Sequence, residues 1–367
     1  MRKIIVKVGT STLTAGGQRL HPPAILELVR QIAQIQQNGD QVILVTSGAI
    51  ATGRELLEFP QLPRDIPARQ MLAAVGQSHL MAIYTQFFSI YAAKVAQVLL
   101  TREDITERKR YLNARNTLES LLDQGIIPIV NENDTVATEE IGIGDNDNLS
   151  ALVANLVEAD VLILLTDQHG LYTVDPRKAQ EARFVQIIDS EEIPQELWQA
   201  ASNLGSAIGT GGMFTKLQAA ETARRSAATV VIAKGDEKDV LLRICAGEKL
   251  GTWVLPVVDK LEARKRFMLA GVTQGAWVTI DSGAEKALHK GGSLLPVGTT
   301  NVQGSFERGE IIEIRSVQGK QIAVGAANYS SQEIARICGL HSDKIHQVLG
   351  VHFGEEVIHH NNMTMLG

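Results

Sequence analysis

The feature that most constrains the fold is a repeated alternation of short apolar runs and helical segments over the first 255 residues. The apolar runs are residues 3–8, 41–45, 95–100, 126–130, 160–165 and 229–233. Continuous runs of Val, Ile and Leu are typical of strands that are covered on both faces. Between them apolar residues recur at helical spacing, as in residues 25–35, which follow two prolines and precede Gly39. The alternation predicts an α/β domain with a mostly parallel sheet sandwiched by helices.

The pattern changes after residue 255. Residues 256–274 are charged in the middle and are predicted to be a linker. From 275 to 353 the apolar runs are short and separated by Gly or Asn, which predicts a small β-rich domain with one short helix. Residues 354–367 contain paired His and Asn and are predicted to be a C-terminal tail.

Composition excludes several classes of protein. No apolar run approaches the roughly 20 residues that a membrane span needs. The chain has a short basic start, but the apolar run after it is broken by Lys7 and no small-residue cleavage site follows, so the segment is interpreted as a first strand and not a signal peptide. Cys245 and Cys338 have no metal-type spacing and are expected to be reduced thiols in the cytoplasm. The net charge of −6 gives no support to general nucleic-acid binding.

Candidate functional residues lie where the apolar runs end, because ligands bind at the carboxyl ends of parallel strands. Lys7 lies in the first run and is followed by Gly9 and three hydroxyl residues, a pattern that lets backbone amides approach an anion. The alternative is a lysine that reaches solvent. Thr46 and Ser47 end the second run at an expected helix start, where Ser47 binds an anion or caps the helix.

The fourth run leads into residues 131–151, which hold six acidic side chains and four asparagines. Repulsion among so many carboxylates opposes folding unless nearby cations neutralise them. Asn131, Asp134, Asn146 and Asp147 suit an ammonium group or the orientation of a lysine. In the alternative interpretation, Asp147 or its neighbour at 145 caps the next helix, and the acidic pair at 139–140 is solvated.

Two further strand ends carry polar residues. Thr166 and Asp167 follow the fifth run directly. The segment 209–216, GTGGMFTK, places glycines and threonines before Lys216 at the start of a helix, which suits an anionic group. Two lysines with a carboxylate between them suit phosphoryl transfer, where catalysis is mainly positioning and charge stabilisation.

In combination these motifs resemble the glutamate 5-kinases of the amino acid kinase family. The resemblance rests on VKVGTSTLT, VTSGAIATGR, QMLAAVGQS, LLTREDITER, YLNARNTL, NENDTVA, GDNDNLSA, LLTDQHGLYTVDPR and GTGGMFTKLQAA. It covers residues 1–255, and the C-terminal part is similar to a PUA domain, with SLLPVG, GSFERGEIIEI and IAVGAANYSSQEI.

The resemblance implies transfer of the γ-phosphoryl group of ATP to the side-chain carboxylate of L-glutamate, the first step of proline biosynthesis. It implies that Lys7 and Lys216 neutralise the transferring group and that Asp147 holds both lysines. The glutamate positions of the family correspond to Ser47, Asp134 and Asn146. Its ATP site corresponds to Lys7, Thr166, Asp167, Thr210, Gly211, Gly212, Met213, Phe214, Thr215 and Lys216. Mg²⁺ is expected on the nucleotide phosphates and not on protein ligands.

The resemblance also implies feedback inhibition by proline and a homodimer or homotetramer. Residues 271–367 contain seven Lys or Arg against nine Asp or Glu, so a structural or regulatory role of the PUA domain is favoured over RNA binding. Two alternatives stay open. One is a related kinase for N-acetylglutamate, carbamate, aspartate or a nucleoside monophosphate, and the other is an RNA-binding or regulatory protein with an inactive kinase domain.

Overall fold

The computed structural model describes residues 1–63, 65–137, 146–174, 181–202 and 212–366. The chain divides into two compact units. The first comprises Met1–Ile105 and Arg115–Lys260, and the second comprises Thr106–Ala114 and Leu261–Gly367. The chain passes from the first unit to the second between Lys260 and Leu261, close to the predicted boundaries at 255 and 275. The sequence gives no signal that residues 106–114 belong to the second unit.

The first unit is built on an eight-stranded sheet in the order β3-β4-β2-β1-β5-β9-β10-β8. Its strands are β1 (Lys3–Val8), β2 (Gln41–Thr46), β3 (Lys94–Leu100), β4 (Ile126–Glu132), β5 (Val161–Thr166), β8 (Ile187–Ile188), β9 (Thr229–Lys234) and β10 (Thr252–Val254). All pairs are parallel except β9 with β10. A two-stranded ribbon, β6 (Leu171–Tyr172) with β7 (Phe184–Val185), lies outside this sheet. The predicted mostly parallel sheet is confirmed, and each of the six predicted runs forms a strand.

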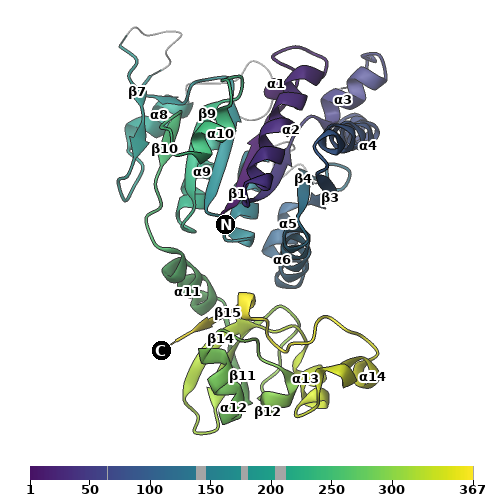
Figure 1. The fold of residues 1–367 in the computed structure, drawn as a ribbon, viewed down its shortest axis with the longest axis vertical. Coiled ribbons are helices and arrows are strands. Elements are labelled where there is room, and N and C mark those ends of the chain that lie inside the picture. The colour runs from purple at the N-terminus through teal and green to yellow at the C-terminus, as the bar shows by residue number, and fades with distance from the viewer. Residues whose placement is uncertain (64, 138–145, 175–180, 203–211, 367) are drawn as a thin grey trace. The chain divides into compact units, whose positions relative to one another are not determined.

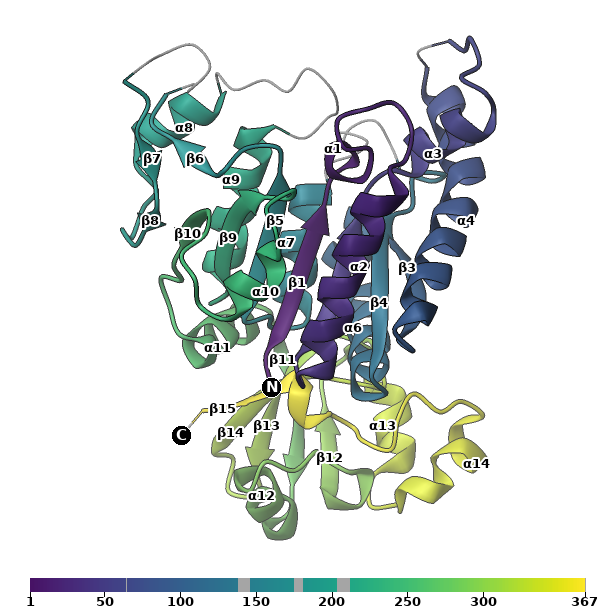
Figure 2. The ribbon, with the colours of Figure 1, turned by 45° about the horizontal axis from the view of Figure 1, so that its top comes forward.

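Helices cover both faces of this sheet (Figure 1, Figure 2). They are α1 (Thr10–Leu13), α2 (Pro22–Gln37), α3 (Ala49–Leu56), α4 (Ile66–Ile90), α5 (Arg102–Thr106), α6 (Arg108–Asp123), α7 (Asn146–Leu156), α8 (Gln195–Ser202), α9 (Met213–Arg224) and α10 (Val240–Cys245). On one face the apolar stripe of α2 packs with α4, α10 and alternate residues of β1, among them Ile4 and Val6. Ile5 is also buried, but it lies outside that cluster. Burial on both faces explains why the strands are continuous apolar runs.

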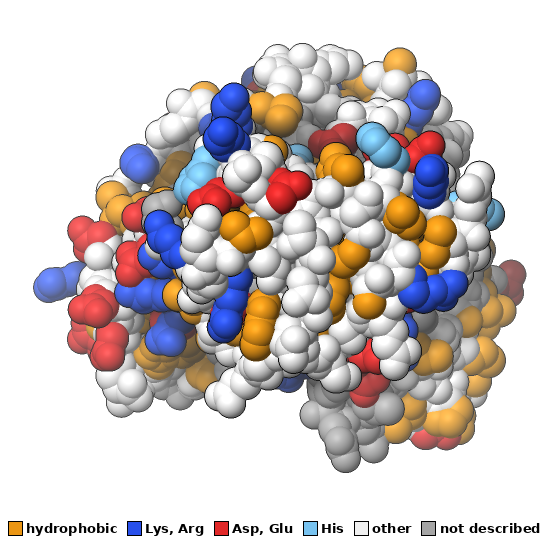
Figure 3. Space-filling view, turned by 90° about the horizontal axis from the view of Figure 1, so that it is seen from below, with side chains coloured by type: hydrophobic (Ala, Val, Ile, Leu, Met, Phe, Trp, Pro, Cys, Tyr) orange, Lys and Arg blue, Asp and Glu red, His pale blue; other side chains and the backbone are white. Residues whose placement is uncertain are grey.

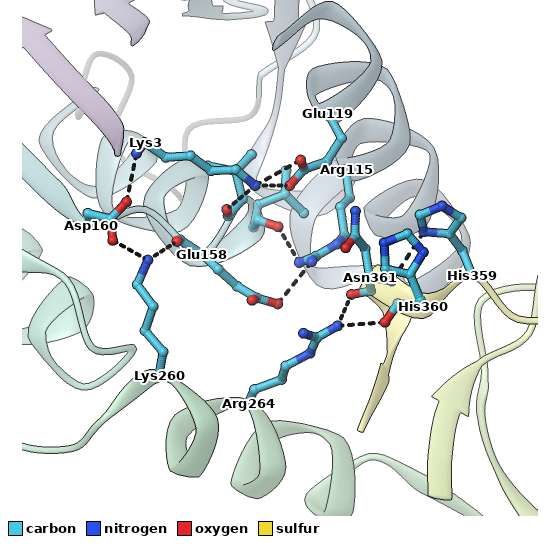
Figure 4. Close-up of polar contacts among 12 residues, drawn as sticks. Lys3, Arg115, Glu119, Glu158, Asp160, Lys260, Arg264, His359, His360 and Asn361 are labelled. Carbon is cyan, nitrogen blue, oxygen red and sulfur yellow. Dashed lines mark hydrogen bonds and ion pairs between the residues drawn. The ribbon is translucent and has the colours of Figure 1, made fainter. Parts of the chain in front are cut away.

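Ion pairs close the amino edge of the sheet, as the upper part of Figure 4 shows. Asp160, just before β5, accepts the main-chain N–H of Lys3 at 2.7 Å and the Lys260 ammonium at 2.6 Å. The Lys3 ammonium donates in turn to Glu119 of α6 at 2.7 Å. The polar groups at this edge therefore bind one another, whereas the strand ends at the carboxyl edge face a cavity.

The second unit contains a five-stranded sheet in the order β12-β11-β13-β14-β15. Its elements are α11 (Lys260–Ala270), β11 (Val272–Ile280), α12 (Ser282–His289), β12 (Thr299–Gln303), β13 (Ile311–Ser316), β14 (Gln321–Ala326), α13 (Ser331–Ile337), α14 (Ile345–Leu349) and β15 (Met363–Met365). The predicted short helix is confirmed as α13, which begins with a capping box of Ser330 and Glu333. The predicted linker, by contrast, is largely helical, because α11 occupies most of it.

Residues 354–366, predicted to be a tail, are instead part of the second unit. Val357 and Ile358 are buried in its core, and β15 pairs with β14. Arg264 donates to the carbonyl oxygen of His360 at 3.1 Å, and Figure 4 shows its guanidinium directed at this segment. The paired His and Asn residues obscured the few apolar residues that dock the segment, so composition alone was misleading here.

Candidate active site

Three charged side chains from separate elements meet at the carboxyl edge of the first unit's sheet. Asp147, in the first turn of α7, lies between Lys7 of β1 and Lys216 of α9. Its Oδ1 is 2.6 Å from Nζ of Lys7, and its Oδ2 is 3.1 Å from Nζ of Lys216. One carboxylate therefore holds two ammonium groups, as the resemblance implied.

Burial strengthens the electrostatic interactions among these three charged side chains. The relative exposures of Lys7, Asp147 and Lys216 are 4%, 1% and 6%. Burial alone would raise the pKa of Asp147, but the ammonium groups of Lys7 and Lys216 outweigh it and hold that pKa well below its usual range. Two cations against one anion leave a net charge of +1, which suits an anionic ligand.

Thr215 adds a contact that the sequence analysis did not assign. Its hydroxyl lies 2.7 Å from Oδ2 of Asp147 and 2.9 Å from the carbonyl oxygen of Gly212. Donation to Asp147 favours the ionised carboxylate and is also a cause of its low pKa. The segment before Lys216 thus orients Asp147 through a side chain as well as reaching the site through its backbone.

A second group at the same edge consists of neutral amides. Nδ2 of Asn146 lies 2.8 Å from the carbonyl oxygen of Thr46, 3.0 Å from Oγ of Ser47 and 3.0 Å from Oδ1 of Asn131. Asn131 donates through its Nδ2 to Oε1 of Gln77 in α4 at 2.7 Å. Ser47 does not cap the next helix, because α3 begins after Gly48, whose φ of 102° favours glycine. Its hydroxyl instead lies beside Asn146.

Asp134 is affected by fewer positive charges than Asp147. Burial raises its pKa to about 6, and the positive charge of Arg69 opposes that rise. Arg69 comes from the first turns of α4 and lines the same cavity as Asp134. At neutral pH Asp134 is therefore an anion that lacks the two close ammonium groups of Asp147.

Both groups border one cavity of about 1680 Å³ in the first unit. Of the predicted site residues, the described ones that line it are Lys7, Ser47, Asp134, Asn146, Thr166, Asp167, Gly212, Met213 and Lys216. Phe214 is 37% exposed and contacts Trp198 edge-on at 5.6 Å between ring centroids, so it is not brought into this group. Thr210 and Gly211 lie outside the described residues, as do the acidic residues 139, 140 and 145.

A metal ion held by the protein itself would need several ligand side chains close together among the described residues. No group of three or more His, Cys, Asp or Glu side chains in that part of the chain is arranged to hold a metal ion. The two cysteines are free thiols, and burial raises the pKa of Cys245 to about 11. None of the helices in the described part of the chain is long and apolar enough to cross a membrane.

Comparison with known proteins decides the family. The model of the amino acid kinase family matches residues 2–234, and that of the PUA domain matches residues 276–349. A glutamate 5-kinase of Deinococcus radiodurans is 47% identical over 99% of this chain and 100% of its own length. One of Pasteurella multocida is 48% identical over 100% of this chain and 99% of its own. The chain belongs to the glutamate 5-kinases of the amino acid kinase family.

Other glutamate 5-kinases match as completely. That of Photobacterium profundum is 49% identical over 99% of this chain and 96% of its own length. The chain also resembles a solved UMP kinase of Bacillus anthracis, which covers 70% of this chain and 97% of its own at 16% identity, with a TM-score of 0.47.

Sequence reasoning missed the contribution of α4 to the site. Arg69 and Gln77 both come from this helix, and Tyr84, farther along, lies 2.7 Å from Oγ1 of Thr46 through its hydroxyl. The helix is rich in apolar residues around most of its circumference, so no polar stripe marks these positions. The available signal was the segment QMLAAVGQS, to which the resemblance attached no role.

Proposed function

We infer that the protein transfers the γ-phosphoryl group of ATP to the side-chain carboxylate of L-glutamate, giving glutamyl 5-phosphate for proline biosynthesis. The observation that carries this inference is the buried carboxylate of Asp147 between the ammonium groups of Lys7 and Lys216. Membership of the glutamate 5-kinases supports the same activity.

Charge stabilisation is the main work of this site in the proposed reaction. The phosphoryl group leaves the bridging phosphate oxygen that remains with ADP and is taken up by a side-chain carboxylate oxygen of glutamate. During this transfer negative charge spreads over the oxygens of the phosphoryl group. Lys7 and Lys216 neutralise that charge, and Asp147 with Thr215 fixes their position before the substrates bind. No general base is required, because the side-chain carboxylate of glutamate is ionised at neutral pH and is itself the nucleophile.

The amide group and Asp134 form the end of the cavity that suits glutamate. Asp134 is an anion that pairs with the α-ammonium group, and Ser47 and Asn146 supply hydrogen-bonding groups beside it. Thr166 and Asp167, with Gly212 and Met213 at the start of α9, are proposed to form the nucleotide end. In this arrangement the lysines lie where the two substrates meet.

Mg²⁺ is proposed to bind the phosphate oxygens of the nucleotide and not a set of protein side chains. The described residues present no three-carboxylate cluster, while Mg²⁺ commonly binds phosphate oxygens and keeps several waters. When bound, it would neutralise charge on the phosphates that the two lysines do not reach. Asp167, one of several acidic residues that line the cavity, is proposed to contact its hydration shell.

Regulation and assembly are part of the same proposal. Proline shares the α-ammonium and α-carboxylate of glutamate, so it is proposed to bind the Asp134 end of the cavity and inhibit. A homodimer or homotetramer in the cytoplasm is proposed from the family resemblance.

For the PUA domain we propose a structural or regulatory role, with RNA binding as the less favoured alternative. The face in Figure 3 carries acidic and basic side chains interspersed, which does not favour a phosphate backbone.

Trapping the acyl phosphate with hydroxylamine tests the activity. Purified protein with ATP, Mg²⁺ and L-glutamate is expected to form the hydroxamate, and proline is expected to suppress it. Parallel reactions with N-acetylglutamate and aspartate, which lack the free α-ammonium or the chain length, are expected to form none. Folded protein that binds ATP but forms no hydroxamate with glutamate would contradict the proposed function and favour the regulatory alternative.

A further inference from the structure

The amide group contains one acceptor that no described residue of the protein satisfies. Oδ1 of Asn146 is buried and has no hydrogen-bond partner, although the side chain is only 4% exposed and borders the cavity. A buried amide oxygen without a partner is costly, and such atoms are uncommon in folded proteins. Its presence at the glutamate end of the cavity points to a donor supplied by the substrate.

Main-chain groups fix which way the two asparagines face. The carbonyl oxygen of Thr46 can only accept, so it holds Nδ2 of Asn146 at 2.8 Å. The N–H of Glu132 can only donate, so it holds Oδ1 of Asn131 at 2.9 Å. These constraints agree with the 3.0 Å contact between Nδ2 of Asn146 and Oδ1 of Asn131. They leave Nδ2 of Asn131 as a donor that needs an acceptor.

Gln77 supplies that acceptor. Its Oε1 lies 2.7 Å from Nδ2 of Asn131, whose side chain is 1% exposed. Gln77 reaches the strand because α4 packs closely on α3 at the preceding residue, Gly76. A Cβ on Gly76 would lie 1.9 Å from the carbonyl oxygen of Ala49, so only glycine permits this approach.

We propose that Gln77 is a positioning residue of the glutamate site, which acts through Asn131 to keep Oδ1 of Asn146 directed at the substrate α-ammonium. This inference rests on the proposed function and assigns a role to the QMLAAVGQS segment. Asn146 and Asp134 then share the three hydrogens of one ammonium group, and Gln77 itself does not touch the substrate. Without that acceptor, Nδ2 of Asn131 is a buried donor with no partner, so the Asn131 side chain is expected to shift to satisfy it. That shift weakens its contact with Nδ2 of Asn146, which is one of the three contacts that orient Asn146.

The test compares Gln77→Met, which keeps length but removes the acceptor, with Gln77→Glu, which keeps an acceptor oxygen. Gln86→Met is the matched control, because Gln86 is an exposed glutamine on the same helix. For Gln77→Met the KM for glutamate is expected to rise about tenfold, the equivalent of about 1.4 kcal/mol, with the KM for ATP unchanged. Gln77→Glu, which keeps an acceptor, is expected to raise this KM less than Gln77→Met does, and Gln86→Met is expected to stay within about twofold of the unmodified protein.

A second readout separates positioning from general disruption. Glutarate has both carboxylates of glutamate but no ammonium group, so its inhibition constant is expected to be the same for Gln77→Met and the unmodified protein. An unchanged KM for glutamate, or an equal weakening of glutamate and glutarate, would overturn the proposal. If Gln77→Met is insoluble, Gln77→Ser, whose hydroxyl is too short to reach Asn131, is tested in the same way. An unmodified protein without glutamate turnover would instead count against the proposed function.

Discussion

The two carboxylates at the ends of the cavity differ in the direction of their pKa shifts. At the lysine end, Asp147 is buried with two ammonium groups, and its pKa lies well below the usual range. At the amide end, burial raises the pKa of Asp134 to about 6, with Arg69 as the opposing charge. The same side-chain type thus holds two cations of the protein at one end and is proposed to receive a substrate cation at the other.

The difference follows from what each carboxylate has to do. Asp147 is fully paired before any substrate arrives, so it serves as a fixed part of the scaffold. Asp134 keeps capacity for a positive charge, and the unpartnered oxygen of Asn146 lies in the same region. The lysine end is therefore ordered before the substrates bind, whereas the amide end can still accept a positive charge and a hydrogen bond. This combination suits a site that binds glutamate and then transfers a phosphoryl group to it.

Removing the charge of Asp147 is expected to have the largest effect on stability. In Asp147→Asn, Lys7 and Lys216 remain buried without their anion, and breaking a buried pair in this way costs about 3–5 kcal/mol. Urea unfolding followed by circular dichroism measures the loss. Asp134→Asn is the control at the other end, and it is expected to lose less than about 1 kcal/mol. Equal losses would remove the distinction between the two carboxylates.

Removing Lys216 is expected to reduce turnover by about 10²–10³-fold, the usual cost of one charge-stabilising donor. Lys216→Met retains most of the side-chain length, and Lys94→Met, at an exposed lysine of β3, is the control. Steady-state assays at saturating ATP and glutamate give the ratio of kcat values. A Lys216→Met protein with full activity would refute the charge-stabilising role.

The pH dependence should report Asp134 and not Asp147. Glutamate binding needs the Asp134 carboxylate, which is ionised above its pKa of about 6 and protonated below it. We therefore expect kcat/KM for glutamate to fall about tenfold per pH unit as the pH drops below 6. Profiles between pH 4.5 and 8 check this, with Asp134→Asn as the variant in which the inflection disappears. An inflection that survives this substitution belongs to another group.

Arg69 should have the smallest effect, because it only opposes the rise in the pKa of Asp134. Arg69→Met is expected to move the inflection upward by less than about one pH unit, since it removes a partly screened charge. The same profiles measure the shift, and 0.5 M salt is expected to reduce it. A downward shift would show that Arg69 does not act on Asp134 as a positive charge.

The sequence predicted the lysine end better than the amide end, and the reason is physical. Lys7, Asp147 and Lys216 each lie next to a strand end or helix start with glycine and hydroxyl neighbours, so local pattern is enough to find them. Gln77 and Asn131 are 54 positions apart, and their contact depends on the close crossing of α3 and α4. Periodicity carries no information about such a contact.

The fold shows the same division. Strands and helices of the first unit follow from continuous apolar runs and helical spacing, because both faces of the sheet are buried. The C-terminal segment was missed because three apolar residues, Val357, Ile358 and Met363, dock it among polar neighbours. The grouping of residues 106–114 with the second unit depends on tertiary packing, for example of Leu112 with Ile311 and Val324.

The most direct test of the account is a comparison of kinetic parameters for Lys216→Met and Asp134→Asn in one glutamate titration series. The account predicts a lower kcat with little change in the KM for glutamate for Lys216→Met. For Asp134→Asn it predicts a higher KM for glutamate with most of kcat retained. If both variants change the same parameter by a similar factor, the cavity is not divided into a phosphoryl-transfer end and a glutamate-binding end, and the account is contradicted.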